Sequence, residues 1–288
     1  MSTMTRRQLL ELAGVGMAAL AAAPAWAAER PFAGPFGVQM YSIREGMQSD
    51  PAAALHMVRQ IGYDEIEAWQ PNGVNARQLK PLLAAAGLRA TSMHTVYAAL
   101  DGKLDALIAN AHELGAGWIV CAWVDAKWRR TGDDYRKLAD KFNRFGERLR
   151  QAGLRLGYHN HTEEFEKFGG RPGLDLLIEN SDPRRLWFEL DIGHARRAGA
   201  RPAEYLRRYP RRIKLLHLKD VAPKPGIAHP RGPDDYQDVP MGTGIIDLPA
   251  VLRQAAANRV ERYYVEEEAG EVRRRLTTDY KYLRSVAV

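Results

Sequence analysis

The segment DPAAALHMVRQIGYDEIEAW, residues 50–69, decides the fold because it contains a complete helix, its stop and the strand that follows. Asp50 can cap the helix, and Pro51 at its first position already has a helical φ angle. Gly62 then ends the helix, because glycine accepts a left-handed backbone at no steric cost. The β-rich run Tyr63–Trp69 follows directly. The segment therefore predicts one helix-to-strand unit of an α/β protein.

The same order of helix, glycine and β-rich run repeats along the chain. Three further helices are expected to end just before a glycine: one over 75–86, one ending at 114, and one from about 131–134 to 152. Four more helices are expected in the second half of the chain, over 173–180, 202–209, 248–258 and 272–283. The strand candidates are 37–43, 63–69, 88–95, 118–123, 155–161, 186–192, 213–219 and 262–267. Alternating strands and helices imply a parallel sheet, and eight such units predict a closed (β/α)8 TIM barrel.

A doubly wound open sheet is the alternative fold, since it shows the same alternation. No glycine-rich phosphate loop follows the first predicted strand, which disfavours a dinucleotide-binding fold. Gly242-Thr243-Gly244 precedes a predicted helix but lacks the rest of that fingerprint, so it is interpreted as a turn. The segment 221–244 contains five prolines and is long for a strand-to-helix connection, which predicts a loop over the mouth of the barrel.

Composition excludes several classes of protein. The chain has 288 residues, of which 45% are hydrophobic and 27% are charged, a soluble globular profile. Its single cysteine, Cys121, excludes a disulfide within the chain and a cysteine-cluster metal site. The formal net charge of +7 comes from basic residues that are spread along the chain, so no nucleic-acid partner is expected.

The N-terminal residues have the pattern of an export signal. Arg6-Arg7 precede an uncharged stretch over 12–23 and the small-x-small sequence Ala25-Trp26-Ala27. The apolar stretch is too short to span a bilayer, and the paired arginines resemble a twin-arginine (Tat) signal, with an ordinary secretory signal as the alternative. We expect a signal peptide over 1–27, a single barrel domain over 28–288, a periplasmic or otherwise exported protein, and no stable membrane insertion after signal removal.

Histidines and carboxylates gather at the C-terminal ends of the predicted strands, where TIM barrels carry their chemistry. Five of the eight histidines lie there: His94, His159, His161, His194 and His217. Taken alone, each has a structural alternative, and Glu189 could be a buried barrel residue that forms hydrogen bonds rather than a ligand. Several strands nevertheless supply ligand types at one level, which predicts a metal site.

Five sequence strings carry a resemblance to a known family. They are GVQMYSIR at 37–44, GYHNHTEEF at 157–165, FELDIGHARRAG at 188–199, LHLKD at 216–220 and VPMGTGIID at 239–247. The whole mature chain resembles the xylose isomerase-like TIM-barrel superfamily and, within it, the sugar phosphate isomerase/epimerase group. The resemblance implies one divalent metal ion between the ends of the last four strands. Mn²⁺ is expected, with Zn²⁺, Mg²⁺ or Co²⁺ as alternatives.

The ligands implied by this resemblance are Asp191, His217 and Glu266, with Glu268 as the fallback for Glu266. At the fifth strand this chain has His159 where many relatives have glutamate, and the ligand role is carried over to His159. The pair of metal-bound glutamates used by epimerases of the superfamily is therefore incomplete, unless Glu164 reaches into the site.

The predicted catalytic residues are His159, Glu266, His94 and Lys219. His159 or Glu266 would take a proton from the carbon next to a sugar carbonyl, while His94 and Lys219 would orient hydroxyls or return a proton. The predicted substrate-binding residues are Tyr41, Glu67, Trp69, Trp123, His161, Glu164 and His194.

This site predicts a metal-dependent isomerase or epimerase acting on a small-molecule carbohydrate. The close alternative is a lyase or hydratase that eliminates across a 3-keto-glycoside or keto-polyol, because the same enediolate can expel a leaving group. A non-catalytic periplasmic sugar-binding barrel is a remote alternative. The DNA-repair endonuclease branch of the superfamily is disfavoured, because it needs more metal ligands and export would remove its substrate. Homo-oligomerisation stays open.

Overall fold

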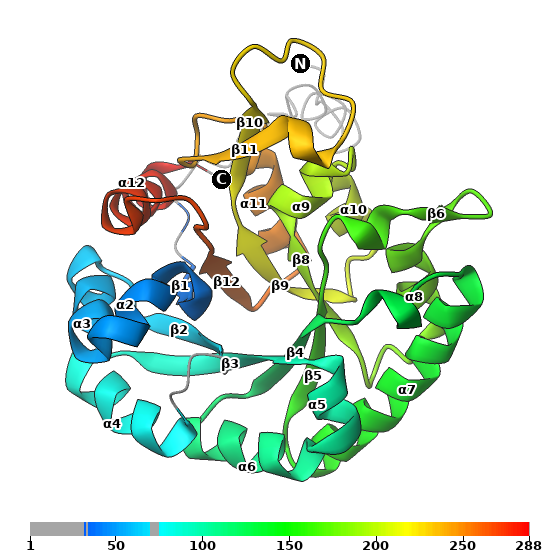
Figure 1. Cartoon of the computed structure of the whole chain (residues 1–288), viewed down its shortest axis with the longest axis horizontal. Helices are drawn as coiled ribbons and strands as arrows, with labels where there is room; N and C mark the ends of the chain where they lie inside the picture. The colour runs from blue at the N-terminus through cyan, green and yellow to red at the C-terminus, as the bar shows by residue number, and fades with distance from the viewer. Residues whose placement is uncertain (1–31, 33, 70–74, 288) are drawn as a thin grey trace, which may run out of the picture. The chain divides into compact units, whose positions relative to one another are not determined.

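The computed structural model describes residues 32, 34–69 and 75–287, and eight parallel strands in them close into a barrel. Figure 1 shows these strands as an inner ring surrounded by helices. In barrel order the strands are β1 (Phe36–Gln39), β2 (Glu65–Trp69), β3 (Arg89–Val96), β4 (Trp118–Trp123), β5 (Arg155–His159), β8 (Trp187–Asp191), β9 (Ile213–Leu218) and β12 (Arg262–Val265). The predicted TIM barrel is confirmed.

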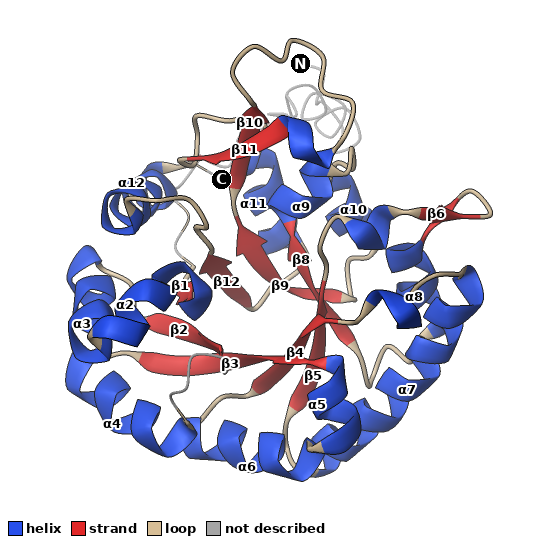
Figure 2. Cartoon of the chain, viewed as in Figure 1, coloured by secondary structure: helices blue, strands red, loops and turns tan. Residues whose placement is uncertain are grey.

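The outer helices follow the strands in the predicted alternation (Figure 2). They are α3 (Pro51–Ile61), α4 (Ala76–Ala86), α6 (Leu104–Leu114), α7 (Gly132–Gln151), α8 (Gly173–Asn180), α10 (Pro202–Arg208), α11 (Leu248–Ala257) and α12 (Val272–Ser285). Asp50 caps α3 by accepting the backbone N–H of Ala53 at 2.9 Å. Gly62 follows the helix with a φ of 123°, a conformation that favours glycine.

Side chains inside the barrel form an apolar layer beneath a polar one. Leu215 and Tyr264 are fully buried in a small apolar cluster with two residues of β4. Because strand side chains alternate between faces, His217 and Glu266, two residues further along, point the same way. The polar residues of neighbouring strands are thereby brought to one level at the C-terminal end of the barrel, above a packed apolar floor.

The segment 221–244 differs from the predicted loop. It contributes to a hairpin of β10 (Asp220–Pro223) and β11 (Tyr236–Val239), which pair antiparallel. The Asp220 carboxylate, at the start of this hairpin, accepts four backbone N–H groups: those of Val221, Gly242, Gly244 and Ile246. A Cβ atom on Gly244 would lie 2.2 Å from Asp220 Oδ1. The Gly-Thr-Gly string is therefore a turn wrapped around a carboxylate.

The expected export signal over 1–27 lies outside the described residues. Within the described ranges, no helix is long and apolar enough to cross a membrane.

Gly146→Ala is expected to destabilise the barrel, against the usual effect of alanine in a helix. Alanine normally stabilises a helix by about 1 kcal/mol relative to glycine. In α7, however, a Cβ atom at position 146 would lie 1.9 Å from the backbone oxygen of Arg185. Overpacking of this kind costs about 1–3 kcal/mol. Urea unfolding measures the change, with Gly102→Ala in α5 (Tyr97–Gly102) as a control, because a Cβ there meets nothing within 4 Å. Equal or higher stability of Gly146→Ala would contradict the close approach.

Candidate active site

A cavity of about 540 Å³ opens at the C-terminal ends of the barrel strands. Nine of the predicted site residues line it: Tyr41, Trp69, His94, Trp123, His159, His161, His194, Glu266 and Glu268. They come from the ends of seven strands or from the residues that follow them. The structure therefore brings together, around one space, residues that are up to 227 positions apart in the chain.

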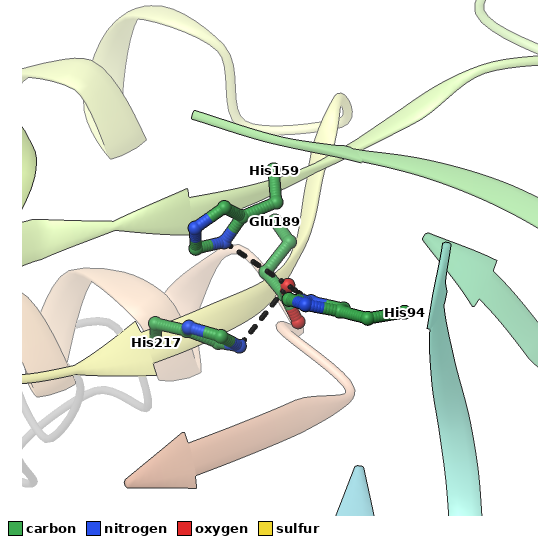
Figure 3. Close-up of side chains that lie close together, drawn as sticks. All are labelled: His94, His159, Glu189 and His217. Atoms are coloured by element: carbon green, nitrogen blue, oxygen red, sulfur yellow. Dashed lines mark hydrogen bonds and ion pairs between the residues drawn. The ribbon is translucent and has the colours of Figure 1, made fainter. Parts of the chain in front are cut away.

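Beneath the cavity, two buried carboxylates are held by histidines. Glu189 Oε2 lies 2.7 Å from His94 Nε2, 3.1 Å from His217 Nε2 and 3.3 Å from His159 Nδ1. Figure 3 shows the three imidazoles converging on this carboxylate. Glu67 Oε2 lies 2.9 Å from His94 Nε2 and 2.6 Å from His217 Nε2. Glu67, predicted to contact substrate, thus lies under the cavity and contacts the histidines instead.

A second group of charges lies nearer the cavity. The Lys219 ammonium is 3.4 Å from Asp191 Oδ2, 2.9 Å from Glu266 Oε2 and 2.5 Å from Glu268 Oε1. His217 Nδ1 approaches the same Glu266 oxygen at 3.1 Å. Burial opposes the charge on Lys219, but these three carboxylates raise the pKa of its ammonium well above the usual value. Lys219 is therefore a fixed cation at this site.

The four predicted metal ligands lie together. One candidate donor atom from each of His159, Asp191, His217 and Glu266 falls within 4.8 Å of the others, and all four residues are buried. Asp191 Oδ2 and His159 Nδ1 are buried and form no hydrogen bond among the described residues; their charged neighbours are Lys219 at 3.4 Å and Glu189 at 3.3 Å. Buried polar atoms without a hydrogen-bond partner are costly unless something occupies the site. Two imidazoles and two carboxylates form a mixed nitrogen and oxygen set, so these residues fit a divalent cation.

A second, overlapping set satisfies the same criterion and contains Glu189, which was not among the predicted ligands. It consists of His94, His159, Glu189 and His217. The Glu189 carboxylate is already engaged by all three histidines at 2.7–3.3 Å. The set with Asp191 and Glu266 is therefore the better candidate for a metal ion. Because residues two apart on a strand share a face, the sequence already placed Glu189 on the same face as Asp191.

His94 and His159, which both line the cavity, have pKa values shifted in opposite directions. Burial disfavours a charge on His94, but Glu67 and Glu189 raise its pKa to about 9. Burial lowers the pKa of His159 well below its usual value, and His217 adds to the effect. The ring centroids lie 5.1 Å apart. The site thus pairs an imidazole whose pKa is raised with one whose pKa is lowered, the arrangement that acid–base chemistry uses.

Glu266 is held as a carboxylate. Burial alone would raise its pKa, but the charges of Lys219 and His217 keep the pKa well below its ordinary value. Glu266 lines the cavity, so it can accept a proton from a bound molecule.

Glu164 does not reach the cavity, contrary to its predicted role. It is buried, and its carboxylate accepts the Tyr158 hydroxyl at 2.9 Å and the His161 backbone N–H at 2.7 Å. These two bonds engage both carboxylate oxygens, so Glu164 holds the backbone of His161 and is absent from the cavity lining. The symmetric pair of glutamates expected of an epimerase is therefore not rebuilt from this residue.

Asn160 joins the fifth and sixth barrel strands and was missed by the sequence interpretation. Its side-chain oxygen accepts the backbone N–H of Asp191 at 3.1 Å, and its side-chain nitrogen donates to the backbone oxygen of Asp191 at 3.4 Å. The position between two histidines in the HNH string was the available signal. Gly193, in the same string as Asp191, makes room for Lys219, because a Cβ there would lie 2.8 Å from the lysine Cβ.

The hairpin of β10 and β11 does not supply described residues to the cavity lining, contrary to the predicted loop over the mouth. Antiparallel pairing and the Asp220 turn hold this segment in its own two-stranded sheet.

Comparison with known proteins gives one family and several relatives. The family described as Xylose isomerase-like TIM barrel matches residues 55–284. An inosose dehydratase of Clostridium botulinum (strain Alaska E43 / Type E3) is 26% identical over 183 residues, 59% of this chain and 58% of that protein. An inosose dehydratase of Lacticaseibacillus casei is 33% identical over 123 residues, 43% of this chain and 40% of that protein. The matches thus span about half the length of these relatives.

Among solved structures, a sugar phosphate isomerase/epimerase from Parabacteroides distasonis ATCC 8503 has a TM-score of 0.70 and 26% sequence identity. The comparison covers 88% of this chain and 94% of that one.

Proposed function

Because this chain belongs to the xylose isomerase-like TIM barrel family, we propose that it is a lyase of the dehydratase type that acts on a keto-sugar, keto-glycoside or keto-polyol. The observation that carries the proposal is geometric: His94, His159 and Glu266 line one cavity, and the carboxylates of Glu67 and Glu189 beside His94 raise its pKa to about 9. Elimination needs one group that accepts a proton and another that donates one. Partial similarity to two inosose dehydratases supports the same choice.

The proton acceptor and the proton donor follow from the charge states. Glu266, which keeps a second carboxylate oxygen when it binds a metal, would take the proton from the carbon next to the carbonyl; His159 would take it only in place of its role as a ligand. The C–H electron pair would form a carbon–carbon double bond as the carbon–oxygen bond of the leaving group breaks. His94 would give its proton to the departing oxygen. The carboxylates of Glu67 and Glu189 both contact His94 Nε2. The other ring nitrogen, Nδ1, is therefore the one that would donate a proton to a bound molecule.

The candidate metal ligands are His159, Asp191, His217 and Glu266. A divalent ion bound there would supply positive charge for the carbonyl oxygen as that oxygen becomes negative. The ammonium of Lys219 adds a second fixed cation to the same region. Mn²⁺ stays the preferred ion on this mixed donor set, with Zn²⁺, Mg²⁺ and Co²⁺ as alternatives.

Isomerisation or epimerisation, the primary expectation from the sequence, is the second candidate function. It is favoured by similarity to the Parabacteroides distasonis protein over most of both chains. The missing second glutamate weighs against a symmetric two-base epimerase, because Glu164 is engaged by Tyr158 and His161. The expected export of the protein favours free sugars or glycosides over sugar phosphates as substrates.

Mass and ultraviolet absorbance distinguish the two candidates. With Mn²⁺ present, we expect a 3-keto-glucoside or keto-inositol to lose its leaving group and give an unsaturated ketone that absorbs in the ultraviolet. A chelator should abolish the reaction, and added Mn²⁺ should restore it. An isomer of unchanged mass from the same substrates would instead favour isomerisation and contradict the lyase proposal.

A further inference from the structure

We infer that the cavity has a second, apolar half that binds an aryl aglycone, so that the substrate is a keto-glycoside rather than a free keto-sugar. This inference rests on the proposed function, because the aglycone would be the leaving group of the elimination. It differs from the activity named for the curated relatives, since the leaving group would be an organic alcohol or phenol rather than water.

The apolar half is formed by one side of the barrel mouth. Its wall contains six apolar residues, Val96, Ala99, Ala106, Leu107, Ala122 and Trp123, together with the polar side chains of Thr95, Lys103 and Asn110. The six apolar residues come from the ends of β3 and β4 and from the helices α5 and α6 that follow β3. Apart from His94 of β3, the histidines and carboxylates that line the cavity lie on or after β5, β8 and β12. One cavity thus offers a cluster of histidines and carboxylates to one end of a molecule and a mainly apolar wall to the other.

Two large apolar side chains of this wall are exposed. Val96 is 38% exposed and Trp123 is 41% exposed, whereas most large apolar side chains of the described residues are buried. The two residues are direct partners in the pairing of β3 with β4, so they form a continuous apolar surface. The register shifts between Thr95 and Val96. Irregularities of this kind re-aim side chains and are common beside active sites.

Trp123 connects the two halves. Its ring meets the ring of His161 edge to face, with centroids 5.4 Å apart. The Arg129 guanidinium lies 5.2 Å from the centroid of the indole ring. These contacts fix the indole at the border between the histidines and the apolar wall. An aromatic group attached to the reacting sugar would therefore meet a positioned aromatic face.

The size of the cavity agrees with a two-part substrate. Its volume of about 540 Å³ falls within the roughly 300–1,000 Å³ typical of sites for drug-sized ligands, more than a single sugar ring needs. In the reaction the C2–H proton passes to the base, the C1–O bond breaks, and a C1=C2 double bond forms beside the 3-keto group. The aglycone oxygen leaves with the bonding pair and takes a proton, so no oxidant or reductant is consumed.

A comparison of two substrates tests the inference. The probes are phenyl 3-keto-β-glucoside and methyl 3-keto-β-glucoside, assayed with the full chain and Mn²⁺. Ala106→Trp fills the apolar wall at an exposed position of α6, and Ala109→Trp makes the same change at an exposed position of α6 outside the cavity lining. For the wild type we expect kcat/KM to be at least tenfold higher for the phenyl substrate. Ala106→Trp should lower this ratio about tenfold, mainly through KM, and Ala109→Trp should leave it unchanged.

A binding measurement separates recognition from turnover. Phenyl β-glucoside, which lacks the keto group, should quench tryptophan fluorescence at a concentration at least tenfold lower than methyl β-glucoside, and Ala106→Trp should remove the difference. Equal kcat/KM and equal binding for both probes would overturn the inference and leave the lyase proposal standing. Failure to convert either keto-glucoside, with phenyl binding intact, would overturn the lyase proposal instead.

Discussion

Asp191→Asn is expected to remove bound divalent metal and to lower kcat/KM by about 10³-fold, while the barrel stays folded. A metal ion that stabilises developing charge contributes several kcal/mol, and each 1.4 kcal/mol corresponds to a factor of about ten. Asp191 has two separable roles. Its Oδ1 caps α9 (Ile192–Arg197) by accepting the His194 N–H at 2.7 Å, and its Oδ2 is buried without a hydrogen-bond partner among the described residues. The amide oxygen of asparagine keeps the cap and removes the negative charge.

The alanine variant separates the two roles. Asp191→Ala also loses the cap, which costs about 1 kcal/mol. Asp247 is a matched control, because it caps α11 in the same way, accepting the Ala250 N–H at 3.0 Å, and is not part of the cavity lining. Asp247→Ala should lose similar stability with unchanged metal content and turnover. Mass spectrometry of the bound metal and circular dichroism measure these effects. Stoichiometric metal together with full turnover in Asp191→Asn would refute the proposed site.

Most of the barrel could be predicted because its signals are local. A helix that ends before a glycine and is followed by a β-rich run needs no tertiary information, and each predicted strand overlaps an observed one. The ends of strands were less predictable. The first strand stops at Gln39, because the chain turns there and the Gln39 side chain accepts the Tyr41 N–H at 3.1 Å. The fifth stops at His159, because the Asn160 side chain bonds the backbone of Asp191 in place of continued strand pairing.

The position of the site could also be predicted, because barrel strands end at one rim. Strand period gives the face of a side chain but not its partners across the barrel. The contacts of Glu67 and Glu189 with the histidines therefore could not be predicted from the sequence. The same holds for the pKa values of His94 and His159, which are shifted in opposite directions. Glu164 shows the same limit. Its position just after the fifth strand predicted that it lines the cavity, but its carboxylate accepts the Tyr158 hydroxyl instead.

Lys219→Met is expected to make the stability of the protein depend on metal. The ammonium is buried and lies within 3.4 Å of oxygens of Asp191, Glu266 and Glu268. Removal of one partner from a buried ionic group costs about 3–5 kcal/mol, because the remaining charges stay buried and uncompensated. A divalent cation on Asp191 and Glu266 would offset part of this repulsion. Urea unfolding should therefore show a large loss of stability with a chelator and a smaller loss with Mn²⁺.

Turnover of the same variant tests the second fixed cation. A positioned group that stabilises charge in a transition state contributes about 10²–10³-fold to kcat, so Lys219→Met should lose activity even when Mn²⁺ is saturating. Lys214 offers a matched control on the same strand, β9, because it lies near the opposite end and contacts the Arg259 backbone oxygen at 3.4 Å. Lys214→Met should change stability by no more than about 0.5 kcal/mol and leave turnover intact. If Lys219→Met loses stability equally with chelator and with Mn²⁺, the ammonium and the metal do not share these carboxylates, and the assignment of Asp191 and Glu266 as ligands fails with it.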